Sequence, residues 1–247
     1  MDVNDTIMHL EDEGYALIED LVDPEEAKHL EALARRLMEH REGYISMEGS
    51  LNHLPEIAPL CMHPLIMELA ERILGEGFHL ANNVAMKWCK PGARPGGLHC
   101  CPADAGGGLP GDPITRLQVF WLLTDYTPEN GATRIIPFSQ HTGRSPRRDA
   151  YPQEIPVIGK RGSVFLFNDC CWHRSGGNTT TDQHRMAACM LYLPAPVETG
   201  PGERQMHGWV KRAIYDKFPE RLQELFANCV EPEEAPADKE PQMWTVE

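Results

Sequence analysis

The chain has 247 residues, of which 41% are hydrophobic, and its formal net charge is −14. This length suits one large domain with a substantial core, and the hydrophobic content is that of an ordinary globular protein. The negative charge argues against nucleic acid or an anionic membrane as the main partner, and no apolar run is long enough to span a bilayer.

The first ten residues carry Asp2 and Asp5 and lack the basic region and apolar stretch of a secretory signal. We therefore expect a cytoplasmic protein without a signal peptide. The chain contains eight cysteines. In that compartment they do not indicate a disulfide framework.

The first third of the chain reads as a short strand followed by two helices. Residues 14–18 form a strand candidate, and Asp23 with Pro24 marks the start of a helix, because Asp is a good N-cap and Pro suits the first helical turn. A second apolar stripe at helical spacing runs from Pro64 to Leu74 and ends at Gly75.

Beyond Gly77 the pattern changes to short strand-like segments separated by turn residues. The predicted strands are residues 78–88, 116–124, 133–137, 163–167 and 186–193. A Gly- and Pro-rich stretch, 102–113, is predicted to be a long mobile loop, and helix returns over 209–226. We expect one β-barrel or sandwich domain over residues 1–230 with helices packed outside, and a disordered acidic tail over 231–247.

Two histidines stand at predicted strand ends beside turn residues, His99 after Gly96-Gly97 and His173 before Gly176-Gly177. Non-haem Fe(II) oxygenases hold iron with two histidines and one carboxylate on one face. Because side chains at i and i+2 share a face of a strand, one ligand pair in such a site has the form His-x-carboxylate. An oxygenase that uses 2-oxoglutarate as co-substrate also needs a cation to hold its distal carboxylate. Arg185, on the strand after His173, can bind that carboxylate with two hydrogen bonds.

Three segments resemble the phytanoyl-CoA dioxygenase family. They are residues 122–141 (LLTDYTPENGATRIIPFSQH), residues 162–169 (GSVFLFND) with the following His173…Asn178…Arg185 run, and the amino-terminal Glu13-Gly14-Tyr15 with residues 23–26. The order and spacing of these segments, over roughly residues 8 to 195, carry the resemblance.

The resemblance implies a double-stranded β-helix, a jelly-roll or cupin-like barrel, with flanking helices and iron at the barrel mouth. It implies His99 and His173 as iron ligands, Arg185 as the 2-oxoglutarate anchor and Ser175 as its support. Gln118 and Phe120 are expected to point toward the same pocket. The implied activity is Fe(II)- and 2-oxoglutarate-dependent dioxygenation, with O2 and a small organic substrate and hydroxylation as the default outcome.

The chain departs from the family's His-x-Asp pattern, because Cys101 stands where the carboxylate is expected. Cys101 can supply a thiolate, Asp104 can reach the metal after the turn at Pro102, or the third protein ligand is missing. The last case resembles the related halogenases, in which halide fills that position.

A different class of site also fits the cysteines. If both strands are regular, Cys101 shares a face with His99, and Cys171 shares a face with His173. Two cysteines and two histidines suit tetrahedral zinc in a structural site, which would make the protein a non-catalytic barrel. Lys87 and Trp88, on a strand before His99, are alternative pocket residues, and the sequence does not decide between them.

Overall fold

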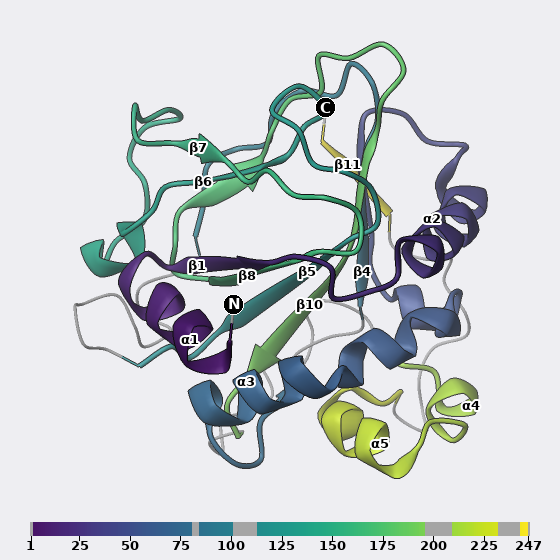
Figure 1. Cartoon of the computed structure of the whole chain (residues 1–247). Helices are drawn as coiled ribbons and strands as arrows, with labels where there is room; N and C mark the ends of the chain where they lie inside the picture. Colours follow the sequence, from purple (N-terminus) through teal and green to yellow (C-terminus); the bar gives the residue numbers. More distant parts are fainter. Residues whose placement is uncertain (1, 81–83, 101–112, 196–208, 232–242, 247) are drawn as a thin grey trace.

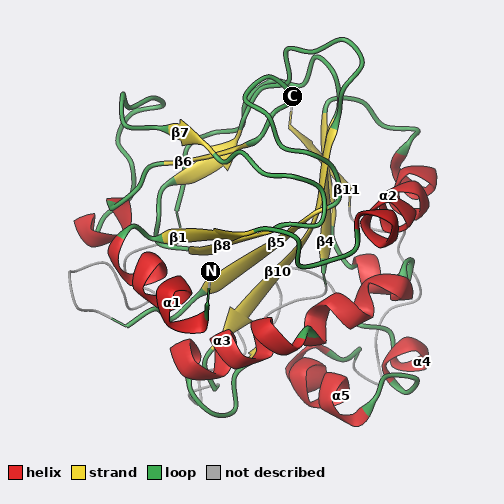
Figure 2. Ribbon diagram, viewed as in Figure 1, coloured by secondary structure: helices red, strands yellow, loops and turns green. Residues whose placement is uncertain are grey.

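The computed structural model describes residues 2–80, 84–100, 113–195, 209–231 and 243–246. An antiparallel sheet and a smaller three-stranded sheet face one another, as Figures 1 and 2 show. The large sheet has the order β1-β8-β5-β10-β4-β2-β11, with β3 paired to β10, and the small sheet has the order β7-β6-β9. The arrangement is a double-stranded β-helix.

The strands of the large sheet are β1 (Tyr15–Ile18), β2 (Tyr44–Met47), β3 (His79–Leu80), β4 (Ala85–Cys89), β5 (Leu117–Leu122), β8 (Val164–Asn168), β10 (Arg185–Leu193) and β11 (Met243–Val246). Those of the small sheet are β6 (Thr133–Ile135), β7 (Ile155–Pro156) and β9 (His173–Ser175).

Helices cover the face of the large sheet that points away from the small sheet (Figure 2). They are α1 (Val3–Asp12), α2 (Pro24–Met38), α3 (Pro64–Leu74), α4 (Arg212–Tyr215) and α5 (Glu220–Phe226). Asp23 caps α2 by accepting the Glu25 N–H at 2.8 Å, and α3 ends at Gly75, as the sequence predicts. No helix in the described ranges is long and apolar enough to cross a membrane.

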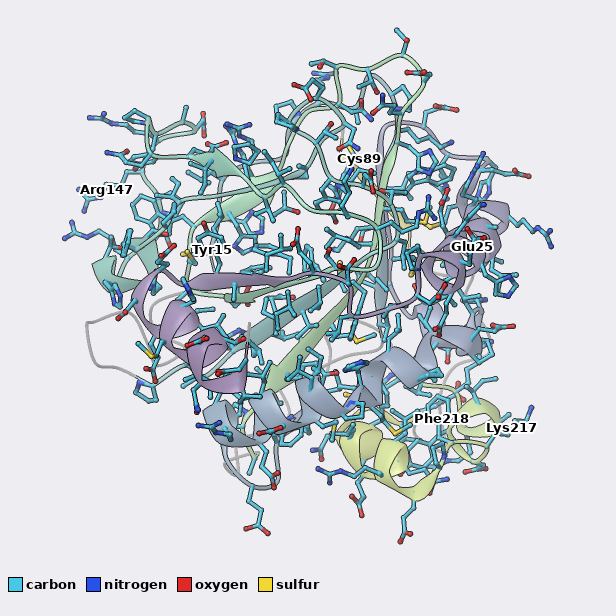
Figure 3. All side chains as sticks on the ribbon, in the orientation of Figure 1. Tyr15, Glu25, Cys89, Arg147, Lys217 and Phe218 are labelled. Atoms are coloured by element: carbon cyan, nitrogen blue, oxygen red, sulfur yellow. The ribbon has the colours of Figure 1, made fainter. Side chains whose placement is uncertain are left out.

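Side-chain alternation divides the interior into two cores. On β5, Val119 and Trp121 point to the helices, whereas Phe120 and Leu122 point to the small sheet. The helix-covered core is the larger of the two and takes most of the apolar side chains. The core between the sheets is smaller, and the buried polar side chains of His173 and Arg185 lie beside it. Figure 3 shows side chains in the space between the two sheets.

The predicted strands and the first two predicted helices are present, but three features differ from the sequence expectations. The region 209–226 is not one helix, because Pro219 caps a separate helix, α5, and has no N–H to continue α4. The sequence reading did not find α1, β2 or β7. Residues 243–246 of the tail, predicted to be disordered, pair with β2 as a strand. Residues 102–112 of the predicted loop lie outside the described residues.

Candidate functional site

His99 and His173 lie side by side across a β-bridge. Each donates its backbone N–H to the carbonyl of the other, at 3.0 Å from His99 and 2.8 Å from His173. The ring centroids are 4.4 Å apart. His173 is buried and His99 is exposed, so the pair sits where the space between the sheets opens to solvent.

The backbone fixes the tautomer of both rings. Nδ1 of His99 lies 2.9 Å from the Gly97 carbonyl, and Nδ1 of His173 lies 2.8 Å from the Cys171 carbonyl. A carbonyl oxygen only accepts, so Nδ1 carries the hydrogen in each ring and Nε2 keeps a lone pair. Burial, together with nearby His99, lowers the pKa of His173 to about 4, so this ring is neutral at pH 7. An imidazole Nε2 with a lone pair is a donor type that iron binds.

Arg185 is the most unusual buried side chain of the site. Its exposed fraction is 0%, and its Nε donates to the Gly131 carbonyl at 2.8 Å. Both terminal nitrogens, Nη1 and Nη2, have no hydrogen-bond partner among the described residues. An unpaired guanidinium is costly to bury, so this position fits an anion that the described residues do not supply.

Two tyrosines border the Arg185 guanidinium, with its central carbon 5.1 Å from the Tyr126 ring centroid and 5.5 Å from that of Tyr44. The Tyr126 hydroxyl is also buried without a partner among the described residues. Burial raises the pKa of Tyr126, so this hydroxyl stays protonated and is a donor. The arginine and Tyr126 together offer an unsatisfied donor set that fits a carboxylate.

Other predicted site residues are placed as follows. Ser175 Oγ accepts the Gly96 N–H at 3.2 Å, which ties β9 to the segment leading into His99. Phe120 faces the space between the sheets and contacts Phe167, which in turn packs edge-on against the His173 ring at 4.6 Å. Gln118 shares that face, but its amide donates to Asp169 Oδ1 at 3.2 Å.

The expected third ligands, Cys101 and Asp104, lie outside the described residues. Within the described ranges, no three His, Cys, Asp or Glu side chains form a ready-made metal group. The zinc interpretation receives no support at Cys171, because its thiol contacts Ser139 Oγ at 3.3 Å and the Ile136 carbonyl at 3.2 Å. Burial raises the pKa of the Cys171 thiol to about 12, which disfavours the thiolate that zinc requires.

The structure decides between Lys87 and Trp88. Trp88 belongs to the helix-covered core, and Lys87 lies on the opposite face of β4, where it pairs with Glu48 at 3.4 Å. Sequence reasoning missed Glu48, Tyr126 and Asp169. Tyr126 and Asp169 each stood in a segment that resembles the family, 122–141 and 162–169, but nothing in the sequence marked either side chain as part of the site.

Solved structures share the barrel fold. The structure is similar to the α-ketoglutarate-dependent epimerase SnoN from nogalamycin biosynthesis, with a TM-score of 0.62 and 21% identity over 78% of this chain and 83% of that one. It is also similar to HygX from Streptomyces hygroscopicus with nickel and 2-oxoglutarate bound, with a TM-score of 0.65 and 14% identity over 77% and 86% of the two chains.

Sequence comparison gives the family. The model for the phytanoyl-CoA dioxygenase (PhyH) family matches residues 10–187. A similar protein is dioxygenase af480 of Aspergillus fumigatus, 26% identical over 92% of this chain and 75% of the relative. Another is dioxygenase trt7 of Aspergillus terreus, 30% identical over 66% of this chain and 57% of the relative. The chain belongs to the phytanoyl-CoA dioxygenase family, and it is an oxidoreductase of the 2-oxoglutarate-dependent oxygenase class.

Proposed function

We propose that the protein binds one Fe(II) through Nε2 of His99 and His173, binds 2-oxoglutarate through Arg185, and uses O2 to hydroxylate a small organic substrate. The observation that carries this proposal is the Arg185 guanidinium, fully buried with two unpartnered terminal nitrogens. A dicarboxylate that reaches from the metal to this arginine explains both the burial and the missing partners.

The residues of the chain position the reactants. The carbonyls of Gly97 and Cys171 hold the two imidazoles in the tautomer that presents Nε2. The Gly131 carbonyl holds Arg185 through Nε, so its two terminal nitrogens remain free for the distal carboxylate of the co-substrate. Bound iron with 2-oxoglutarate supplies the oxygen activation that no side chain can provide.

Ser175 supports the co-substrate side of the site indirectly. Its hydroxyl accepts the Gly96 N–H and so fixes the segment that carries His99 relative to β9. Phe120 and Phe167 keep an apolar wall beside His173, which limits water around the reacting centre.

The substrate is proposed to be a small organic molecule. Structural relatives have been solved with such molecules bound, SnoN with nogalamycin RO and HygX with hygromycin B. Lys87, on the inner face of β4, and Glu48, which follows β2, form a polar pair on the wall of the space between the sheets, and Ser46 donates to Glu48 at 2.6 Å. A substrate with polar oxygens fits this wall better than a plain hydrocarbon.

A second candidate outcome is a halogenase-like or otherwise altered oxygenase, because Cys101 stands where the His-x-Asp pattern has its carboxylate. Without the carboxylate of the His-x-Asp pattern, a halide has a position to fill. Chloride-dependent product formation separates halogenation from hydroxylation.

The test is an anaerobic titration of Fe(II) with and without 2-oxoglutarate, following the visible charge-transfer absorption of the chelate. The wild type is expected to show the band. Arg185→Met is expected to need about 100-fold more 2-oxoglutarate, which corresponds to about 2.7 kcal/mol. Arg161→Met is the matched control, because Arg161 pairs with Glu31 at 2.8 Å on the helix side, and it should titrate as the wild type does.

Two results would contradict the proposal. One is a wild-type protein that arrives with tightly bound zinc and gives no band with Fe(II) and 2-oxoglutarate. The other is an Arg185→Met variant that binds 2-oxoglutarate with wild-type affinity, since the buried guanidinium would then have some other partner.

A further inference from the structure

Lys87 and Glu48 form a charged pair on the inner face of the large sheet. Nζ of Lys87 lies 3.4 Å from Oε1 of Glu48, and the two side chains are 23% and 11% exposed. Ser46 donates its hydroxyl to the same Oε1 at 2.6 Å. Oε1 therefore accepts both hydrogen bonds, and Oε2 of Glu48 has no hydrogen-bond partner among the described residues.

The ammonium of Lys87 keeps donors that the chain does not use. It carries three N–H groups, and within the described part of the chain its bond to Glu48 is the only one it forms. Burial alone would lower the pKa of Lys87, but nearby Tyr44 and Glu48 outweigh burial and raise it. Lys87 is therefore charged at pH 7, and the charged pair offers donors on the ammonium beside an acceptor at Oε2 of Glu48.

Strand register places the charged pair beside the proposed 2-oxoglutarate site. Lys87 pairs with Ala187 of β10, and Arg185 stands two residues before Ala187 on the same face. Cys189 stands two residues after it. Burial raises the pKa of the Cys189 thiol to about 12, and the charges of Lys87, Arg185 and Glu48 also act on this pKa, so all three groups lie near one thiol. The charged pair therefore borders the same space as the arginine.

An apolar row that solvent reaches adjoins the charged pair. Ala85 of β4, Cys189 of β10 and Phe120 of β5 stand in register across the sheet, and they keep 7%, 6% and 9% exposure. In the neighbouring row, Ala187 and Leu122 are only 0% and 1% exposed. A molecule that enters the space between the sheets can therefore lie along the first row with one end at the charged pair.

We propose that the charged pair binds a hydroxyl group of the substrate, and that the substrate is a neutral alcohol with an apolar carbon skeleton. This inference rests on the proposed function, in which the space beside Arg185 holds 2-oxoglutarate and the substrate. A hydroxyl both donates and accepts, so it matches Oε2 of Glu48 and the ammonium of Lys87 at once. A substrate carboxylate would meet the negative charge of Glu48, and a hydrocarbon would leave both groups without a partner.

The experiment measures the binding of matched probes and needs no turnover. Cyclohexanol, borneol and 2-naphthol are compared with their methyl ethers, which have no O–H to donate, by equilibrium dialysis against the anaerobic protein with Fe(II) and saturating 2-oxoglutarate. We expect the wild type to bind at least one alcohol about tenfold more tightly than its ether. Equal affinity for alcohol and ether on all three skeletons, or no binding of any alcohol, overturns the inference.

A double variant tests whether the charged pair causes this preference. Lys87→Met/Glu48→Leu removes both charges together, because removal of one alone leaves an unpaired buried charge. This variant should bind the alcohol and the ether alike, and a preference that persists in it overturns the inference. Lys160→Met is the matched control, because Lys160 pairs with Asp125 at 3.1 Å on the exposed surface, and it should keep the wild-type preference.

Glu48→Gln distinguishes substrate binding from a purely structural ion pair. It keeps the shape of the side chain and removes its negative charge, so the positive charge of Lys87 is no longer balanced. Cyclohexanecarboxylate and 2-naphthoate should then bind about tenfold more tightly than in the wild type, and the alcohols more weakly. A pair that only stabilises the fold would lower the melting temperature here and leave these affinities unchanged, which overturns the inference. If the double variant does not fold, Glu48→Gln decides.

Failure of the inference is separate from failure of the proposed function. If Fe(II) and 2-oxoglutarate give the charge-transfer band but alcohols and ethers bind alike, the oxygenase site stands and the charged pair does not bind a substrate hydroxyl. If the alcohol preference depends on the charged pair but no band forms with Fe(II) and 2-oxoglutarate, the hydroxyl site stands and the proposed oxygenase function is wrong.

Discussion

The two faces of the large sheet are built from the same strands but differ in role. One packs against the helices, and the other carries polar side chains of the candidate site. The face under the helices carries side chains such as Val119, Trp121 and Met186, and its core is apolar. The face toward the small sheet carries Arg185 and Lys87 on the neighbouring strands. Because side chains alternate along a strand, neighbouring residues of one strand belong to the apolar core and to the candidate site. Burial of apolar side chains under the helices supplies stability that the polar face lacks.

The largest change in stability is expected from a substitution in the helix-covered core. Trp121 is 1% exposed and lies against His63, with ring centroids 5.3 Å apart. Trp121→Ala should lower the free energy of unfolding by about 3–5 kcal/mol, measured by urea denaturation, because it removes a large buried ring and leaves a cavity.

The neighbour Phe120, on the other face, provides the comparison. Phe120→Leu keeps an apolar side chain beside Phe165 and Phe167, so the cost should stay below about 1.5 kcal/mol. A folded Trp121→Ala protein should bind 2-oxoglutarate as the wild type does. A tenfold change in that affinity would show that the two faces are not independent.

A smaller effect is expected from a single hydroxyl on the inner face. Tyr126→Phe removes a donor that has no partner among the described residues and that lies beside Arg185. The dissociation constant of 2-oxoglutarate should rise about tenfold, or about 1.4 kcal/mol, in anaerobic calorimetry with Fe(II). Stability without ligand should not fall, because no hydrogen bond within the described part of the chain is lost.

Tyr192→Phe is the matched control on the helix-covered face. Its hydroxyl donates to the Cys61 carbonyl at 2.9 Å, so its removal should cost about 1 kcal/mol of stability and leave the affinity for 2-oxoglutarate unchanged. If Tyr126→Phe behaved in the same way as Tyr192→Phe, the hydroxyl of Tyr126 would not contact the co-substrate.

The smallest effect concerns the ionic contact that fastens α2 to the sheet. Glu31 lies 2.9 Å from His184 Nε2 and 2.8 Å from Arg161 Nη1. Burial alone would raise the pKa of Glu31, but His184 and Arg161 outweigh burial and lower it. The folded pKa is therefore below the unfolded one, so the carboxylate stabilises the protein above the ordinary carboxyl range. This contribution is lost as the pH falls from about 4.3 through the lower folded value.

Glu31→Gln should cost about 1 kcal/mol at pH 7 and much less at pH 3, where the wild-type carboxyl is protonated as well. Urea midpoints of both proteins at the two pH values measure this difference. If the urea midpoints of the two proteins differed equally at pH 7 and pH 3, the charge of Glu31 would contribute nothing to stability.

The sequence alone predicted the barrel and most of its strands. Alternating apolar residues between turns predict strands, and the Asp23 cap and Gly75 stop predict helix ends, because these signals are local. The placing of Gln118 and Phe120 on one face also follows from a local rule, the two-residue period of a strand.

Only the tertiary structure decided which groups the side chains of the candidate site contact. The Gly131 carbonyl that anchors Arg185 lies 54 residues away in the chain, and Gln118 and Asp169 are 51 residues apart. The choice of Lys87 over Trp88 depended on which face of β4 the helices cover. Strands such as β2 and β11 are defined by their partners, since short segments gain stability only by pairing, and no local signal reports a partner that is distant in sequence.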